Sequence, residues 1–316
     1  MKKVLYMLLY GTLLLSILAL TACSGGESSG AGTDDPGKIT VYTSIYPVYD
    51  FAAKIGGDKI NLHMMVPSGT EPHDWEPKPK DMARLQEADV FIYNGAGMES
   101  WVDKVLNSID NEKLIAVEAS DGIKLMENPY ESDEHEDDGG HEHKNDPHVW
   151  LDPMRAKKQM ENIMEALSKA DADNADYYED NYMKYSMELE KLDEEYRDTL
   201  EKCRNRDIIV THPAFGYLCD AYDLNQIAIG SIGSESEPSS ARMAEITNFA
   251  RENDIKIIFF EETTGNKLAK TIADEVGGET MTLSTLERLS DEDIKSGKDY
   301  FSVMTDNLKA LEKALR

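Results

Sequence analysis

A chain of 316 residues is longer than one hydrophobic core usually serves, so we expect two domains. Hydrophobic residues make up 41% of it, which excludes global disorder. With 61 acidic and 33 basic side chains, the formal net charge is -28. The electric field of so negative a chain repels phosphate backbones and attracts cations, so we expect no nucleic-acid partner. Taken alone, the acidity is explained most simply by solubility.

The first residues have the pattern of an export signal. Lys2 and Lys3 precede an apolar run from Val4 to Leu20, and Leu-Thr-Ala then leads directly into Cys23. This order predicts a signal peptide over residues 1–22 and a mature chain acylated at Cys23, hence a lipid anchor. A transmembrane anchor is the alternative, because the run is near the minimum spanning length. The position of the cysteine favours the lipoprotein.

The next segment, residues 23–37, is small, polar and glycine-rich, which is typical of a flexible tether. After it, strand-like and helix-like segments alternate in both halves of the chain. The predicted strands are Ile39–Thr43, Asn61–Val66, Val90–Tyr93, Leu114–Val117, Ile208–Thr211, Gln226–Ile229, Lys256–Phe260 and Thr280–Leu283. The predicted helices are Pro47–Ile55, Pro79–Glu87, Glu99–Asn107, Phe215–Tyr222, Ser239–Asn253, Asn266–Val276 and Tyr300–Leu315. Alternation of this kind predicts an α/β fold of two lobes, each a small, mostly parallel sheet flanked by helices.

The join between the lobes carries the longest helical pattern. Asp152-Pro153 has the residues of a helix start. Apolar and aromatic side chains then recur at steps of three or four from Tyr178 to Cys203, with no glycine or proline between residues 175 and 209. This predicts one interdomain helix of about 30 residues, ~45 Å long, whose stripe packs into the core and whose stiffness limits lobe movement. The predicted domains are therefore an N-terminal lobe (38–172), a linking helix (173–206) and a C-terminal lobe (207–316).

Residues 127–146 interrupt the first lobe with nine acidic side chains and three histidines, His135, His141 and His143. The segment lacks apolar periodicity, which predicts a surface loop. Both a solvated acidic loop and a metal-collecting loop fit this composition. Elsewhere in the mature chain, Cys203 and Cys219 can form a disulfide in an exported protein or remain two thiols.

Three of the seven histidines occupy similar local sequences. His73, His148 and His212 lie in predicted loops of both lobes, each beside a proline that restricts the backbone, whereas His63 lies within a strand and is interpreted as structural or surface-exposed. Ligands of open α/β sheets bind beyond the carboxyl ends of strands. Neutral imidazole is a good zinc ligand, and three imidazoles need one more group to complete a tetrahedron. The pattern predicts an interlobe metal site.

These segments also carry a family resemblance. EPHDWEP, DPHVWLDP, THPAFGYL, SESEPSS and IIFFEE occur here in this order. In them the chain resembles the zinc- and manganese-specific solute-binding lipoproteins of ABC importers, from about Ile39 to the C-terminus. The resemblance implies two lobes joined by one long helix, with the metal held in the cleft between them.

The resemblance also implies a ligand set. His73, His148 and His212 match the three histidine ligands of the family, and Glu287 in TLSTLERLS falls at the position of its carboxylate ligand. Glu261 and Glu262 are the alternative carboxylates, or groups that orient the histidines, and Asp74 and Asp146 can have the same orienting role.

Ligand type favours Zn²⁺, one ion per chain. Three imidazoles and one carboxylate suit zinc, whereas Mn²⁺ favours oxygen-rich sites, and manganese members of the family tend to carry glutamate at the position of His212. Copper and nickel can still bind such a set.

The resemblance implies that the protein is a receptor on the outer face of a bacterial membrane, which delivers zinc to an ABC permease. We expect it to act as a monomer without enzymatic activity. A manganese receptor of the same family is the first alternative. A zinc hydrolase is the second, although the sequence has neither HExxH nor a nucleophile elbow. The third is an adhesin that uses metal only to stabilise its fold.

Overall fold

The structure is a computed structural model that describes residues 34–130, 144–230, 238–261 and 265–316. Within it, Pro36–Arg316 form one compact unit. Several predicted features lie outside the described residues: the signal peptide and Cys23, most of the tether, Glu262, and the loop histidines His135, His141 and His143. None of the helices in the described part of the chain could serve as a transmembrane span.

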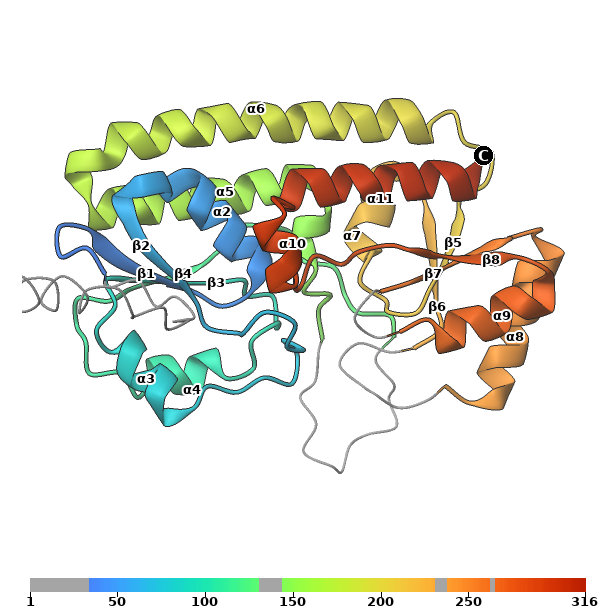
Figure 1. The fold of residues 1–316 in the computed structure, drawn as a ribbon, viewed down its shortest axis with the longest axis horizontal. Helices are drawn as coiled ribbons and strands as arrows, with labels where there is room; N and C mark the ends of the chain where they lie inside the picture. The colour runs from blue at the N-terminus through green and yellow to red at the C-terminus, as the bar shows by residue number, and fades with distance from the viewer. Residues whose placement is uncertain (1–33, 131–143, 231–237, 262–264) are drawn as a thin grey trace, which may run out of the picture. The chain divides into compact units, whose positions relative to one another are not determined.

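The N-terminal lobe is built on a four-stranded parallel sheet of order β2-β1-β3-β4 (Figure 1). The strands are β1 (Ile39–Thr43), β2 (Ile60–Met64), β3 (Val90–Tyr93) and β4 (Ile115–Glu118). Its helices are α2 (Tyr46–Gly56), α3 (Pro79–Leu85) and α4 (Val102–Leu106). Successive side chains of β3 point to opposite faces, so Val90 and Ile92 enter the main core while Phe91 packs with Leu85 and Trp101 in a second cluster. Both faces of the sheet are therefore covered.

The C-terminal lobe repeats this plan with a parallel sheet of order β6-β5-β7-β8. Its strands are β5 (Asp207–Val210), β6 (Asn225–Ala228), β7 (Ile257–Phe260) and β8 (Glu279–Thr282). Its helices are α7 (Gly216–Tyr222), α8 (Ser240–Glu252), α9 (Lys267–Val276), α10 (Asp291–Lys295) and α11 (Tyr300–Leu315). The two faces again separate by alternation, because Phe259 enters the main core while Ile258 packs in a local cluster with Ile246 and Ile272.

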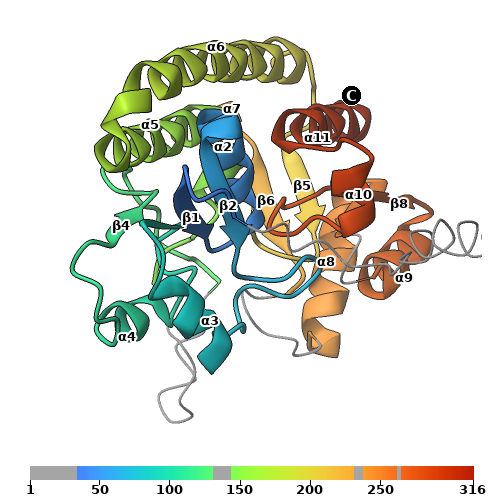
Figure 2. The same cartoon turned by 60° about the vertical axis from the view of Figure 1, so that its left-hand side comes forward.

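Two further helices join the lobes. In α5 (Pro153–Ala170), the Asp152 side chain accepts a hydrogen bond from the backbone N–H of Met154 and so caps the first turn. The following helix, α6 (Ala175–Leu200), has 26 residues and packs against α5, α2 and α11, all of which lie on its inner side (Figures 1 and 2). Its buried residues are Tyr178, Ser186, Leu189, Leu192, Tyr196 and Leu200. The predicted long helix with a core-facing stripe is confirmed, as is the two-lobed α/β fold.

One hydrophobic cluster extends through both lobes. It contains Phe51 of α2, Tyr196 of α6, Phe259 of β7 and Leu311 of α11. Because these side chains share one core, the two sheets are connected by packing as well as by the chain.

The structure corrects several predicted boundaries. Most strand limits shift by one residue, and α4 begins at Val102 instead of Glu99. Glu99 does not join the helix because its carboxylate turns inward and accepts hydrogen bonds from the backbone N–H groups of Asn94 and Gly95. The short helix α10 had no apolar periodicity from which to predict it. Cys203 and Cys219 are both free and buried, so they form no disulfide.

Candidate metal centre

Four side chains from both lobes converge where the parallel strands end. His73 lies on the loop after β2, and His148 on the long connection after β4, directly before a 3₁₀ turn at Val149–Leu151. His212 follows β5 by two residues, and Glu287 follows β8 by five. Since carboxyl ends of parallel strands are the usual place for ligands in α/β folds, the predicted location agrees with the structure.

The four groups are close enough to share one ion. One ligand atom from each of His73, His148, His212 and Glu287 lies within 4.8 Å of the others. Glu287 Oε1 is 2.8 Å from His148 Nε2, 3.3 Å from His212 Nε2 and 3.6 Å from His73 Nε2. The His148 and His212 Nε2 atoms are 3.3 Å apart. A tetrahedral zinc ion with bonds of about 2.0–2.1 Å holds its ligand atoms about 3.3 Å apart, so the donor set fits zinc in both chemistry and spacing.

Burial differs among the four side chains. Those of His73 and Glu287 are 1% exposed and that of His148 is fully buried, whereas His212 keeps 15% exposure. Three ligands are therefore sheltered from water, and His212 alone of the four lies partly at the surface. A buried polar cluster of this kind is costly unless its members are paired or bind an ion.

Asp146 fixes the orientation of His148. Its Oδ1 lies 2.7 Å from His148 Nδ1 and accepts a hydrogen bond of 3.0 Å from the backbone N–H of the same residue. A carboxylate at Nδ1 keeps a proton on that nitrogen, so Nε2, which faces Glu287 and the other histidines, is the nitrogen that can bind a metal ion once its own proton has left. The orienting role predicted for Asp146 thus has a geometric basis.

A strained turn carries Glu287 into the cluster. The preceding residue, Leu286, has φ of 61°, a left-handed conformation that is uncommon for a residue with a Cβ atom. Its side chain is 1% exposed, and its backbone N–H donates to Ser284 Oγ at 3.2 Å. Burial and this hydrogen bond hold the turn that aims Glu287 inward.

The electrostatics of the cluster are those of a cation site. Burial alone would raise the pKa of Glu287, but His212, His148 and His73 hold it well below its usual range, so the carboxylate is charged. For His148 the effects are reversed. Burial lowers its pKa, but Asp146 and Glu287 outweigh burial and raise it to about 10. Protons therefore compete with a metal ion for the imidazole nitrogens.

Other charged side chains surround the four. Glu261 is 5% exposed, and burial raises its pKa to about 7 although nearby His212 lowers it. Arg288, which sequence reasoning missed although it directly follows Glu287, forms an ion pair of 3.0 Å with Glu71 Oε2 and lies 3.9 Å from Glu261 Oε2. The Glu71–Arg288 pair joins the loops that carry His73 and Glu287.

The remaining predicted residues lie elsewhere. Asp74 is exposed on the loop beside His73. His63 lies on β2, where its ring stacks on Tyr42 with centroids 4.9 Å apart, and it is not part of the cluster. Glu262 and the three loop histidines are outside the described ranges, so their predicted roles stay predictions.

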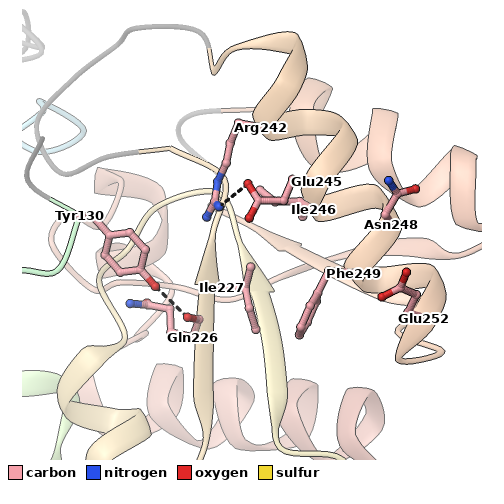
Figure 3. Close-up of a pocket in the computed structure, with 9 residues that line it drawn as sticks. All are labelled: Tyr130, Gln226, Ile227, Arg242, Glu245, Ile246, Asn248, Phe249 and Glu252. Carbon is pink, nitrogen blue, oxygen red and sulfur yellow. Dashed lines mark hydrogen bonds and ion pairs between the residues drawn. The ribbon is translucent and has the colours of Figure 1, made fainter.

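An open pocket of about 520 Å³ lies between β6 and α8 (Figure 3). Tyr130, Ile227, Arg242 and Phe249 are among its lining residues, none of which belongs to the cluster. Arg242 donates hydrogen bonds to the carbonyl of Ala228 and to the carboxylate of Glu245, so its guanidinium is already engaged. The metal-binding chemistry is therefore in the buried cluster and not in this pocket.

Comparison with known proteins identifies the family of the chain. Residues 41–314 match the family model ZnuA, described as "Zinc-uptake complex component A periplasmic". The chain is 42% identical over 302 residues to the high-affinity zinc uptake system protein ZnuA of Bacillus subtilis (strain 168), covering 94% of each. It is 39% identical to the zinc-binding lipoprotein AdcA of Streptococcus pneumoniae (strain ATCC BAA-255 / R6), covering 95% of this chain but 59% of AdcA.

A solved structure supports the same relationship. The fold is similar to that of the Zn(II)-bound ZnuA-like domain of Streptococcus pneumoniae AdcA, with a TM-score of 0.76 and 39% identity over 88% of this chain and 99% of that domain. The residues matched by the family model, 41–314, span nearly the whole described fold and include the histidine and glutamate cluster. The family is one of solute-binding receptors and not of enzymes. The chain belongs to the ZnuA family of zinc-uptake components.

Proposed function

We propose that this protein is a high-affinity zinc receptor that captures one Zn²⁺ per chain and delivers it to an ABC-type importer. The ligands in this proposal are the Nε2 atoms of His73, His148 and His212 and Oε1 of Glu287. The observation that carries it is the approach of these four atoms to within 4.8 Å of one another from two lobes. Zinc is here the cargo of the protein.

The donor set supports zinc over manganese. Three imidazoles and one carboxylate form a nitrogen-rich site of low coordination number, whereas manganese prefers more oxygen ligands. Relatives named for zinc uptake or zinc binding, at 39–42% identity, agree with this choice. A manganese receptor of the same family is the alternative, and competition between the two ions distinguishes them.

The partly exposed His212 supports a route of entry. Because the other three ligands are 1% exposed or less, a metal ion arriving from solvent meets His212 first and is then transferred to the buried groups. Delivery to a permease requires the ion to leave this site, and the proposal keeps the predicted division into lobes at 38–172 and 207–316 and a linking helix at 173–206.

The same proposal includes the location and the partners. The pattern at the N-terminus supports a lipoprotein anchored through Cys23 to the outer face of the cell membrane, and a relative named zinc-binding lipoprotein agrees with it. A monomer that docks on an ABC permease through its two lobes is sufficient for delivery. The acidic loop at 127–146, with its three histidines, either collects zinc or is only solvated.

Metal titration tests the proposal. The mature chain without its lipid, stripped of metal and titrated in competition with a zinc chelator, should bind one zinc per chain with submicromolar affinity. Replacement of His148 by alanine should abolish that binding, whereas His63→Ala, a histidine outside the cluster, should not change it. Failure of the unmodified chain to bind zinc would refute the receptor.

Two variants of the experiment distinguish the other candidate functions. Glu287→Ala should weaken zinc binding in a receptor, whereas in a zinc hydrolase the metal would remain and turnover would change. Removal of zinc should leave a receptor folded, as measured by circular dichroism. In an adhesin that uses zinc only to stabilise its fold, the same treatment should unfold the chain.

A further inference from the structure

We propose that Trp150, Tyr300 and Asn307 are positioning residues that hold His148 and Glu287 at metal-binding separation before zinc arrives. The proposal rests on the zinc-receptor function proposed above and concerns side chains that do not contact the metal themselves. It is carried by a closed ring of buried and partly buried hydrogen bonds that passes through both ligand-bearing segments and through α11.

The first links of the ring connect the segment of His148 with the segment of Glu287. The indole N–H of Trp150, two residues after His148, donates to the carbonyl oxygen of Thr285 at 2.7 Å. Thr285 precedes Glu287 by two residues. A single side chain therefore fixes the two ligand segments to each other, across 135 residues of sequence.

The remaining links connect both segments to the last helix. The hydroxyl of Tyr300, the first residue of α11, donates to the carbonyl oxygen of Trp150 at 2.7 Å. Two turns later, the Asn307 side chain exchanges two hydrogen bonds with the backbone of Ser284: its amide donates to the carbonyl at 2.8 Å and its oxygen accepts from the N–H at 2.9 Å. Helix α11 thus closes the ring between Tyr300 and Asn307.

Four residues of the ring are shielded from water. Trp150 and Tyr300 are fully buried, Asn307 is 3% exposed and Thr285 is 4% exposed. A donor removed from such a site leaves the carbonyl that it served without a partner and without water to replace it. The links made by Trp150 and Tyr300 are therefore costly to break, because each leaves a buried carbonyl unsatisfied, whereas the links of Asn307 to Ser284 are only partly buried.

The consequence appears at the metal site. With the two segments fixed, Glu287 Oε1 and His148 Nε2 lie 2.8 Å apart, so they need to separate only slightly to reach the spacing of about 3.3 Å between ligand atoms of a tetrahedral zinc ion. A pair of ligands held in place loses little conformational freedom when metal binds, which strengthens binding without any added contact to the ion. We therefore assign zinc affinity in part to these three residues.

A closed ring makes a prediction that independent contacts do not make. The ring connects the two ligand segments by two routes, one directly through Trp150 and one through α11 by way of Tyr300 and Asn307. Loss of either Tyr300 or Asn307 already opens the second route, so the loss of both has little further effect on the ligand geometry. Effects on zinc affinity should then be non-additive between Tyr300 and Asn307, whereas separate contacts at distant sites contribute additively.

The test compares zinc affinity in three single variants and one double variant. Trp150→Phe removes the indole donor, Tyr300→Phe removes the hydroxyl, and Asn307→Leu removes both amide hydrogen bonds at similar volume. The matched control is Tyr196→Phe. Tyr196 is fully buried, and its hydroxyl donates to the carbonyl of Met304 in α11 at 2.6 Å, but this hydrogen bond is not one of the links that hold the ligand segments. Circular dichroism confirms that each variant is folded. If one single variant fails to fold, the other two still test the proposal.

Each single ring variant should bind zinc about 10-fold more weakly, the loss typical of groups that orient metal ligands. The double variant Tyr300→Phe/Asn307→Leu should also lose about 10-fold instead of ~100-fold, and the visible spectrum of bound Co²⁺ should change in all of them. Tyr196→Phe should bind within about twofold of the unmodified protein. Ring variants with unchanged affinity, or losses that multiply in the double variant, would overturn the proposal. Failure of the unmodified chain to bind zinc would instead refute the receptor function itself.

Discussion

Replacement of Asp146 by asparagine tests whether the group behind a ligand controls zinc affinity. In the structure, Asp146 Oδ1 serves His148 twice, at 2.7 Å from the ring nitrogen Nδ1 and at 3.0 Å from the backbone N–H. Asparagine keeps the shape of the side chain and can still accept these hydrogen bonds, but it removes the negative charge that makes the imidazole a stronger donor to metal.

The expected magnitude follows from the role of such partners. Removing the group that orients a metal-bound histidine costs about 10- to 100-fold in affinity, or ~1.4–2.7 kcal/mol of binding free energy. Because Asp146 fixes both the ring and the backbone of His148, we expect a loss within this range for Asp146→Asn. Zinc affinity is measured by competition with a chromophoric chelator on folded, metal-free protein.

Asp152→Asn is the matched control. Asp152 is also buried and lies near His148 in sequence, but its carboxylate caps α5 and accepts a hydrogen bond from Arg155 at 2.6 Å instead of contacting a ligand. The control should lower the free energy of unfolding and leave zinc affinity within about twofold of the unmodified protein. Equal affinities for Asp146→Asn and the unmodified protein would refute the orienting role of Asp146.

Three other outcomes are expected. Gly216→Ala should weaken zinc binding, because a Cβ atom at residue 216 would overlap Oδ2 of Asp146 and displace the Asp146 carboxylate from His148. Chelator competition measures the loss of affinity, and unchanged affinity would contradict this reasoning. Zinc affinity should fall as pH falls, because Asp146 raises the pKa of His148 to about 10 despite burial and zinc must displace a proton at neutral pH. Calorimetry in two buffers of different ionisation enthalpy should show net proton release, and its absence would be inconsistent with a protonated apo site. Cys203 and Cys219 should react with a thiol reagent only after denaturation, because both are buried; rapid reaction of the native protein would show that they are accessible.

The fold was predictable because its signals are local. Short apolar runs such as VFIY at Val90–Tyr93 and the glycine-free stripe of α6 report directly on burial, and the structure reproduces β1, β3 and α11 at the predicted residues. Predicted helix ends were less accurate. Glu99 fits the helical spacing of α4 but is removed from it by hydrogen bonds to the end of β3, a tertiary effect that spacing does not contain.

The candidate site was only partly predictable from its residues. His73, His148 and His212 stood out by their proline-flanked loops, whereas Glu287 was identified only through a family resemblance because its surroundings are not distinctive. The ring through Trp150 was not predicted. Its hydrogen bond to Thr285 joins residues that only the folded chain brings together, and a tryptophan in sequence does not indicate which carbonyl its N–H meets.

The central claim is that two lobes place four side chains around one zinc ion. A crystal structure of the one-to-one zinc complex tests it most directly. We predict a single ion within about 2.0–2.2 Å of the Nε2 atoms of His73, His148 and His212 and of Oε1 of Glu287. An ion bound elsewhere, or a coordination shell that lacks any of these four side chains, would contradict it.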